Sequence, residues 1–136
     1  MHMVFPATLD SLHKMLELIR SEAIAAGFTS AMEAKLELAL EEALVNIIKH
    51  GYPQSSGDID LAITRFQSGI KITLKDTGIP YNPLNTSASV ANDPALPLEL
   101  IPVGGYGIRL ILTIMDHVEY QRVDDANILT LIKSRE

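Results

Sequence analysis

The amino-acid sequence predicts an α+β fold, a two-layer sandwich with three main helices on one face of a mixed, largely antiparallel sheet. Two observations support this prediction. Apolar residues recur at helical spacing over residues 8–27 and 30–52, whereas residues 58–75 and 118–133 alternate between apolar and polar positions as strands do. We expect a single domain over residues 1–136, because a chain of 136 residues with 47% hydrophobic content can bury one proper core.

The first part of the chain contains a short strand and two helices. Residues 4–6 are apolar and end in proline, which borders strands, and therefore predict an edge strand. The first helix occupies residues 8–27 and stops at a glycine. Ser30 and Glu33 match a capping box, in which a serine and a glutamate three residues apart satisfy each other's backbone N–H groups. The second helix therefore begins here and continues to residue 52.

A β-hairpin with one buried face follows at residues 58–66 and 70–75. Counting by two along the apolar positions of its second strand brings Asp76 to the next inward-facing position. A carboxylate in an apolar series needs a partner, because burying it alone is costly. The alternative interpretation is that Asp76 only starts a turn with Thr77 and Gly78.

The last two strands are predicted at residues 118–123 and 128–133, around a turn at residues 124–127. In the final strand Ile128, Thr130 and Ile132 alternate with two leucines, so both faces are largely apolar. We therefore expect the second face of the sheet to meet another subunit or a partner protein.

Between the two pairs of strands, residues 79–105 lose all periodicity and contain five of the seven prolines. A loop of this length inside a compact domain indicates a functional lid or disorder. It ends at residues 104–107, which read Gly-Gly-Tyr-Gly, and an apolar helix over residues 108–115 follows. Glycines that lead into a helix can form a backbone site for an anion, and a flexible hinge is the alternative.

The second helix carries polar residues beside its apolar stripe. Glu42 and Asn46 are four residues apart and therefore point the same way, one turn apart, with Lys49 nearby. These side chains are an acid, a neutral oxygen ligand and a cation at the rim of a buried face. The alternative is a solvated helix edge with a charge pair.

Composition excludes several classes of function. A net charge of -6 leaves no basic field to hold a phosphate backbone, so we expect no direct nucleic acid partner. The chain has no cysteine and therefore forms neither disulfides nor thiolate metal sites. No apolar run reaches the roughly 18 to 20 residues that span a bilayer, so we expect a cytoplasmic protein without a membrane partner.

Taken in order, three motifs resemble the nucleotide-binding boxes of the histidine-kinase-like (GHKL) ATPase superfamily, and most closely those of its anti-sigma-factor serine/threonine kinases. Residues 41–52 (EEALVNIIKHGY) resemble the N box, residues 76–83 (DTGIPYNP) the first glycine box and residues 104–111 (GGYGIRLI) the second. Residues 127–131 (NILTL) are similar to the terminal strand of that branch. The resemblance covers nearly the whole chain, and the ordered combination is far more specific than any single motif.

This resemblance implies that the domain binds ATP and Mg²⁺, and it implies roles for individual residues. Asn46 would hold Mg²⁺, which prefers oxygen ligands. Glu42 would be the catalytic general base that takes a proton from the attacking hydroxyl. Asp76 would accept a hydrogen bond from the adenine amino group, with Thr130 assisting it directly or through water. Gly78 would let the backbone come close to the base.

The resemblance further implies that the glycines of the second box contact the nucleotide. Gly104, Gly105 and Gly107 would let the loop at residues 79–105 fold over the phosphates as an ATP lid. Lys49 would neutralise phosphate charge, although a surface cation near a helix end is an equal alternative. The chain departs from the superfamily at Pro80, where a further glycine is common, and this departure argues against a flexible hinge at that position.

Two functions fit this resemblance. The first is a protein serine/threonine kinase that sequesters a sigma factor and phosphorylates a serine or threonine of an anti-anti-sigma (STAS-type) antagonist, and we expect it to form a homodimer. The second is a non-catalytic, ATP-dependent module that switches between binding partners. The presence of Glu42 favours the kinase, because a pure binding module needs no base there.

Overall fold

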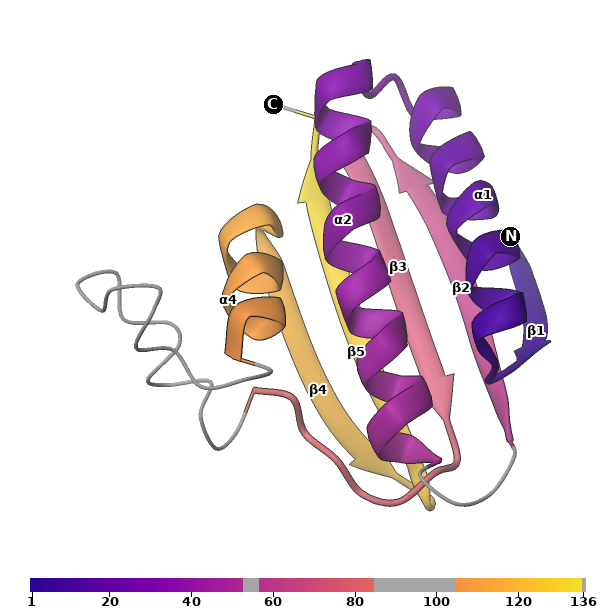
Figure 1. The fold of residues 1–136 in the computed structure, drawn as a ribbon. Helices are drawn as coiled ribbons and strands as arrows, with labels where there is room; N and C mark the ends of the chain where they lie inside the picture. Colours follow the sequence, from indigo (N-terminus) through magenta and orange to yellow (C-terminus); the bar gives the residue numbers. More distant parts are fainter. Residues whose placement is uncertain (53–56, 85–104, 136) are drawn as a thin grey trace.

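The fold was analysed in a computed structural model, which describes residues 1–52, 57–84 and 105–135 (Figure 1). Three helices form one layer and five strands form the other, as the sequence predicts. In chain order the elements are β1 (His2–Pro6), α1 (Leu9–Ala25), α2 (Ser30–Asn46), the π-helical turn η1 (Ile47–Gly51), β2 (Asp58–Phe66), β3 (Gly69–Asp76), α4 (Gly105–Ile114), β4 (His117–Val123) and β5 (Ala126–Ser134).

The strands follow the order β1-β2-β3-β5-β4, and all four pairings are antiparallel. The prediction of a mixed sheet is therefore wrong in this detail, since the described strands include no parallel pair. Strand β1 is an edge strand, as predicted, and β4 is the other edge. Strand β5 lies between β3 and β4, because β4 forms the far edge and the turn at Asp124 and Asp125 returns the chain along its inner side.

The core lies between the helices and the helix-facing side of the sheet. Alternate residues of β2 and β3 face it and are almost fully buried, because successive side chains of a strand point to opposite faces. Helices α1 and α2 contribute the other half of this core, and α4 packs beside α2. The fully buried large side chains are Met15, Ile19, Leu36, Leu40, Leu44, Ile59, Leu61, Ile63, Ile70, Ile72, Leu74 and Leu131.

Two local predictions were wrong by a small shift in position. The cap of α2 is Thr29 rather than Ser30: the Thr29 hydroxyl accepts a hydrogen bond of 3.2 Å from the backbone N–H of Met32. The last turn is shorter than residues 124–127, because only Asp124 and Asp125 lie outside the strands, both with positive φ. Two consecutive residues with positive φ form the tight hairpin turn that matches strand twist.

Glu33, which a capping box would direct to the helix terminus, is buried instead. Only 7% of its surface is exposed, and its Oε1 atom has no hydrogen-bond partner in the described parts of the chain. Burial raises the pKa of the Glu33 carboxyl, and the carboxyl of Glu37 one turn further on raises it too. The charged form of Glu33 therefore opposes folding at neutral pH.

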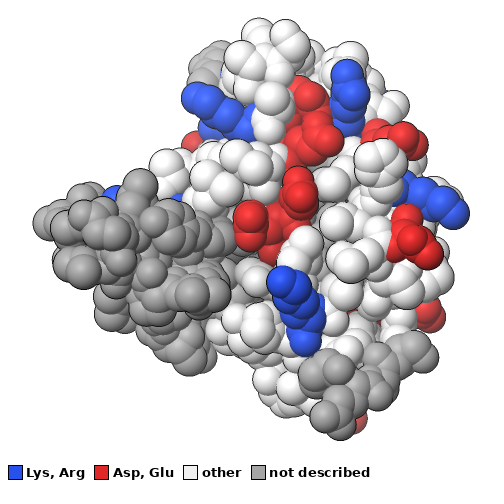
Figure 2. All heavy atoms as spheres, viewed as in Figure 1, with Lys and Arg blue, Asp and Glu red and all other residues white. Residues whose placement is uncertain are grey.

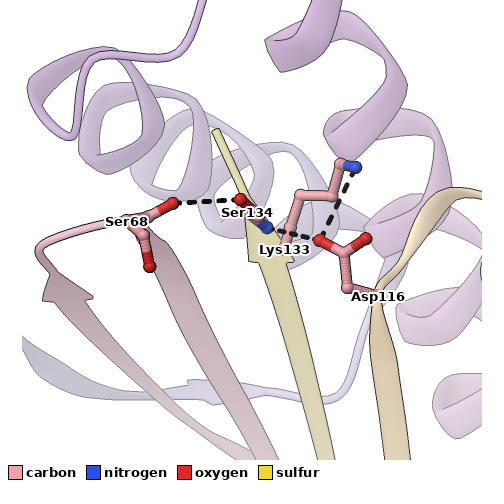
Figure 3. A network of polar contacts seen from close by, with 4 residues as sticks. All are labelled: Ser68, Asp116, Lys133 and Ser134. Carbon is pink, nitrogen blue, oxygen red and sulfur yellow. Dashed lines mark hydrogen bonds and ion pairs between the residues drawn. The ribbon is translucent and has the colours of Figure 1, made fainter. Parts of the chain in front are cut away.

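The end of the sheet near the amino end of α2 is closed by polar contacts (Figure 3). The Ser134 backbone N–H donates to Asp116 Oδ2 at 2.6 Å, and the Ser134 hydroxyl donates to the Ser68 carbonyl oxygen at 3.3 Å. Lys133 lies 3.8 Å from the same Asp116 oxygen. These contacts join the end of β5 to the β2–β3 turn and to the α4–β4 connection.

Acidic side chains gather near the middle of the helix-bearing face, and lysines and arginines stand around them singly (Figure 2). No helix of the described residues is long and apolar enough to cross a membrane.

The cap of α2 provides a first prediction. Thr29→Ala removes the acceptor for the Met32 N–H and is expected to lower the free energy of unfolding by about 1 kcal/mol. Ser30→Ala, its neighbour, is expected to change this energy little. Urea unfolding of both variants measures the difference, and equal losses would contradict the cap at Thr29.

Glu33 provides a second prediction. Its pKa is higher in the folded than in the unfolded protein, so its contribution to stability is fully present below the unfolded pKa and is lost as pH rises through the folded pKa. Glu33→Gln should therefore stabilise the protein more at pH 7 than at pH 4. Thermal unfolding at both pH values is the measurement, with the exposed Glu17→Gln as control; a gain equal at both values would contradict the buried charge.

Candidate functional site

A pocket opens between the carboxyl end of α2, the carboxyl end of β3 and the amino end of β5. Its walls are mainly apolar, with a few polar groups among them, as is common in ligand sites. The residues that line it are Ala43, Asn46, Ile47, Gly51, Asp76, Tyr81, Pro83, Ile111, Tyr120, Asn127 and Leu129. Each of the elements α2, η1, β3, α4, β4 and β5 contributes at least one of them.

Asp76 lies at the inner wall of this pocket. It is the last residue of β3, its side chain faces inward as the apolar series predicts, and only 4% of its surface is exposed. Its Oδ1 atom accepts hydrogen bonds of 3.0 Å from the Gly78 backbone N–H and from Asn127 Nδ2. Asp76 therefore both starts the turn with Gly78 and occupies a buried position, so the two interpretations of this residue are compatible. No described residue donates to Oδ2, which leaves this oxygen for a ligand.

Asn127 holds this end of the pocket together. Its Nδ2 donates to Asp76 Oδ1 and, at 2.9 Å, to the Ile79 carbonyl oxygen. Its Oδ1 accepts from the Tyr81 backbone N–H at 3.3 Å and from the Tyr120 hydroxyl. One buried amide thus fixes the carboxylate, the chain that follows β3 and a side chain of β4.

Thr130 does not take part in this network. It pairs with Thr73 in the β3–β5 register, whereas Asp76 pairs with Asn127. Because side chains alternate along β5, Thr130 points to the opposite face from Leu129 and Leu131, which are buried in the core. The structure therefore does not bring Thr130 to Asp76. Asn127 occupies the position beside Asp76 that was predicted for Thr130. Counting inward positions back from Leu131 would have identified Asn127 from the sequence.

Gly78 is needed for a contact within the protein. A Cβ atom built at Gly78 would lie 2.2 Å from the Gly51 carbonyl oxygen, so no larger residue fits there. The same carbonyl accepts a hydrogen bond of 3.0 Å from the Ile79 N–H. Tyr52 strengthens this contact. Its hydroxyl accepts a hydrogen bond of 2.9 Å from the Thr77 backbone N–H and donates one of 2.9 Å to the Asp58 backbone carbonyl oxygen. The end of η1 is thus locked against the chain that leaves β3.

The polar residues of the second helix differ in their relation to the pocket. Asn46 lines it, and its Nδ2 atom is buried without a hydrogen-bond partner among the described residues. Glu42 is half-buried one turn earlier and does not line the pocket. Lys49 is exposed and lies outside the pocket lining as well. Asn46 therefore presents an unmatched polar group to the pocket, a feature of sites completed by a ligand.

An aromatic pair closes one side of the site and was not predicted. The rings of His50 and Tyr81 stack with their centroids 4.6 Å apart and their planes 13° from parallel. Tyr81 lines the pocket, and burial raises the pKa of its hydroxyl. His50 does not line the pocket itself, but its ring packs against Tyr81, which does.

The second glycine box is described only in part. The predicted helix is present, but it spans Gly105–Ile114 rather than residues 108–115, so Gly105 and Gly107 lie in its first turn instead of preceding it. Further along this helix, Ile111 reaches the pocket. Gly104 and most of the lid predicted at residues 79–105 lie outside the described residues.

Comparison with known protein families decides the identity of this fold. Residues 5–133 match the histidine kinase-like ATPase domain. The chain belongs to this family. The resemblance seen in the sequence is thereby confirmed at the level of the family. The pocket at Asp76 and Asn46 accordingly lies between the first two motifs of an ATPase domain.

Relatives of this ATPase domain include proteins named serine-protein kinase RsbW. That of Bacillus cereus (strain AH820) is 27% identical over 95 residues, which cover 69% of this chain and 59% of the relative. That of Bacillus mycoides (strain KBAB4) is 27% identical over 104 residues, which cover 76% of this chain and 65% of the relative. The chain thus spans less than two thirds of the length of these relatives.

The network at Asn127 leads to a third prediction. Asn127→Ala leaves the Ile79 carbonyl and the Tyr120 hydroxyl without their buried partner and should lower the free energy of unfolding by about 1 to 3 kcal/mol. Thr130→Ala, on the opposite face of the same strand, should lower it less. Guanidinium unfolding of the two variants is the measurement. A larger loss for the threonine variant would show that the positioning residue had been misidentified.

Proposed function

We propose that this ATPase domain is a protein serine/threonine kinase that binds ATP with Mg²⁺ and transfers the γ-phosphoryl group to a serine or threonine of a protein substrate. The observation that carries this proposal is the pocket, which is lined by the buried carboxylate of Asp76 and by the half-buried Asn46, whose Nδ2 atom is buried without a partner among the described residues. Membership of the family and the name of the relatives support it.

The inner end of the pocket suits the adenine base. Ile47, Ile111 and Leu129 provide apolar walls for a flat ring. Asp76 supplies an acceptor, because its Oδ2 atom receives no hydrogen bond from the described residues while Oδ1 is held by Asn127. A carboxylate fixed in this way selects a ring that carries an amino group, since a ring without a donor would leave the buried oxygen unpaired.

Asn46 fits the Mg²⁺ and phosphate end of the nucleotide. Its buried Nδ2 atom needs an acceptor, which a nucleotide oxygen would supply, and its amide oxygen is the kind of hard ligand that Mg²⁺ prefers. When bound, Mg²⁺ neutralises charge on the phosphates. Lys49, together with Gly104, Gly105 and Gly107, is proposed to contact the same phosphates.

Glu42 is the proposed general base. It lies four residues before Asn46 on the same helix face, about 6 Å along the axis, and is half-buried. In this role its carboxylate takes the proton from the serine or threonine hydroxyl as that oxygen attacks. The other residues of the site bind and orient the nucleotide, which is the main source of catalysis in phosphoryl transfer.

The proposed partners follow from the resemblance to anti-sigma-factor kinases. We propose that the protein sequesters a sigma factor and phosphorylates an anti-anti-sigma antagonist of the STAS type. A homodimer in the cytoplasm is proposed as the working form. The proposed dimer interface is the outer face of the sheet. On this face Ile128, Thr130 and Ile132 are partly exposed.

One observation favours the second function, a non-catalytic module that binds ATP in order to choose between partners. Glu42 does not line the pocket, so the structure gives it no contact with the nucleotide space. A base acts on the incoming hydroxyl rather than on the nucleotide, and the kinase proposal therefore accommodates this position. Activity of the variants below separates the two functions.

The fourth prediction compares two variants of α2. Glu42→Ala should reduce phosphoryl transfer by about 10²- to 10⁴-fold with ATP affinity nearly unchanged, because a base acts mainly in the transition state. Asn46→Ala should weaken ATP binding in the presence of Mg²⁺ by about tenfold or more, a loss of at least about 1.4 kcal/mol. Transfer from labelled ATP to a STAS-type protein and ATP affinity by calorimetry are the measurements.

Glu41→Ala is the matched control, because Glu41 is the exposed neighbour of Glu42 on the same helix. It should leave both quantities unchanged. Full transfer by the Glu42 variant would refute the kinase mechanism and leave the binding module. Unchanged ATP affinity in the Asn46 variant would refute the proposed ligand.

A further inference from the structure

The pocket at Asp76 and Asn46 is nearly closed as it stands. Its free volume is about 20 Å³. A single water needs about 10 to 15 Å³, whereas an apolar cavity that binds benzene has about 150 Å³. Adenine is larger than benzene. The pocket therefore has room for a water but not for a nucleotide base, and part of its wall has to move before a base enters.

Most of that wall belongs to regular elements, which hold their place while the fold is intact. Of the described residues that line the pocket, only Tyr81 and Pro83 lie outside the helices and strands. Proline has a short side chain that its ring fixes to the backbone. Tyrosine carries a large ring that rotates between staggered positions. Tyr81 is therefore the wall residue whose movement opens the most space.

The backbone at Tyr81 is fixed, so the side chain moves without the chain. The Tyr81 N–H donates to Asn127 Oδ1 at 3.3 Å, and the Ile79 carbonyl oxygen accepts from Asn127 Nδ2 at 2.9 Å. The Ile79 N–H donates to the Gly51 carbonyl oxygen at 3.0 Å. These bonds hold the course of residues 79–81 and leave rotation about the Cα–Cβ bond of Tyr81 free.

The ring of Tyr81 is held in the closed position by its stack on His50, with the centroids 4.6 Å apart. Its hydroxyl forms no hydrogen bond with a described residue. A stacked aromatic pair shifts an equilibrium by about two- to tenfold. His50 exerts this effect from outside, because it is exposed and does not line the pocket. The stack thus favours closure and is weak enough for a ligand to overcome.

We propose that Tyr81 is the gate of the nucleotide pocket: its ring, stacked on His50, closes the pocket and swings away to admit the base. His50 acts through Tyr81 and is therefore a positioning residue. Because only the open fraction of the protein binds, closure lowers the apparent affinity and the association rate in proportion. The identity of the ligand rests on the proposed function, whereas closure by Tyr81 does not.

A thiol placed inside the pocket reports how often the gate opens. The chain has no cysteine, so Ala43→Cys introduces the only thiol, at a lining position that is 2% exposed. Its thiolate attacks the disulfide of dithiobis-nitrobenzoate, an aromatic reagent too large for the closed pocket, and forms a mixed disulfide while a coloured thiolate leaves. The rate of colour release measures access to the pocket.

Variants of the two stacked residues should change this rate. His50→Ala removes the stacking partner and leaves Tyr81 in place, so the rate should rise by about two- to tenfold. The association rate of ATP, measured in the cysteine-free chain, should rise by the same factor. His50→Phe keeps an aromatic face and should restore the slow rate. Tyr81→Ala should raise the rate by at least about tenfold, whereas Tyr81→Phe should keep the thiol protected.

Two controls separate a gate from a loosened fold. Ala39→Cys places the thiol on the same helix but in the core, where Ala39 is fully buried and does not line the pocket, and it should react slowly in every background. His13→Ala, at an exposed histidine of α1, should leave the pocket thiol as slow as before. Equal acceleration at the two thiol positions would contradict the gate.

Other outcomes would also overturn it. Rapid reaction of the pocket thiol with both rings in place would show that the pocket is already open. Equal thiol rates and equal ATP association rates with and without His50 would show that the stack does not hold the pocket closed. Excess ATP with Mg²⁺ should slow the thiol reaction in the His50→Ala background. Loss of this protection alone, in variants whose thiol rates follow the gate, would refute the proposed nucleotide and leave the gate in place.

Discussion

The hydrogen bond between Asp76 and Asn127 is the contact on which the site depends. It joins β3 to β5 at the point where the apolar core ends, and both partners are more than nine-tenths buried. A buried carboxylate is tolerated only when donors surround it, and here the donors are one amide and one backbone N–H. Because the same amide also holds Ile79 and Tyr81, the position of the carboxylate and the course of the chain after β3 are set together.

The inward-facing residues of β5 run from the pocket to the opposite end of the core. The series begins with Asn127 at the pocket, continues through Leu129 and Leu131 in the core, and ends with Lys133, which lies 3.8 Å from Asp116 Oδ2. Helix α4 packs against α2, and its Ile111 lines the pocket.

Two buried polar atoms of the described residues, Glu33 Oε1 and Asn46 Nδ2, have no hydrogen-bond partner, and their surroundings differ. Glu33 lies at the amino end of α2, where its unpaired oxygen and raised pKa oppose folding. Asn46 lies near the other end of the same helix, where its unpaired nitrogen faces a pocket. An unmatched group in a closed core destabilises the protein, whereas one beside open space is satisfied when a ligand arrives.

Periodicity in the sequence by itself determined the helices, the two hairpins, the edge strand and the inward position of Asp76, because burial imposes a period that one chain segment shows alone. The ordered motifs similarly determined the family. The tertiary structure alone decided what depends on register between distant segments: that β5 lies beside β3, that Asn127 rather than Thr130 meets Asp76, and that His50 stacks on Tyr81. It also placed the helix cap at Thr29 rather than at Ser30, because both residues carry a hydroxyl and the sequence alone does not distinguish them. A shift of one residue in a strand reverses every side chain, and no local pattern fixes which residue of a second strand lies opposite the first.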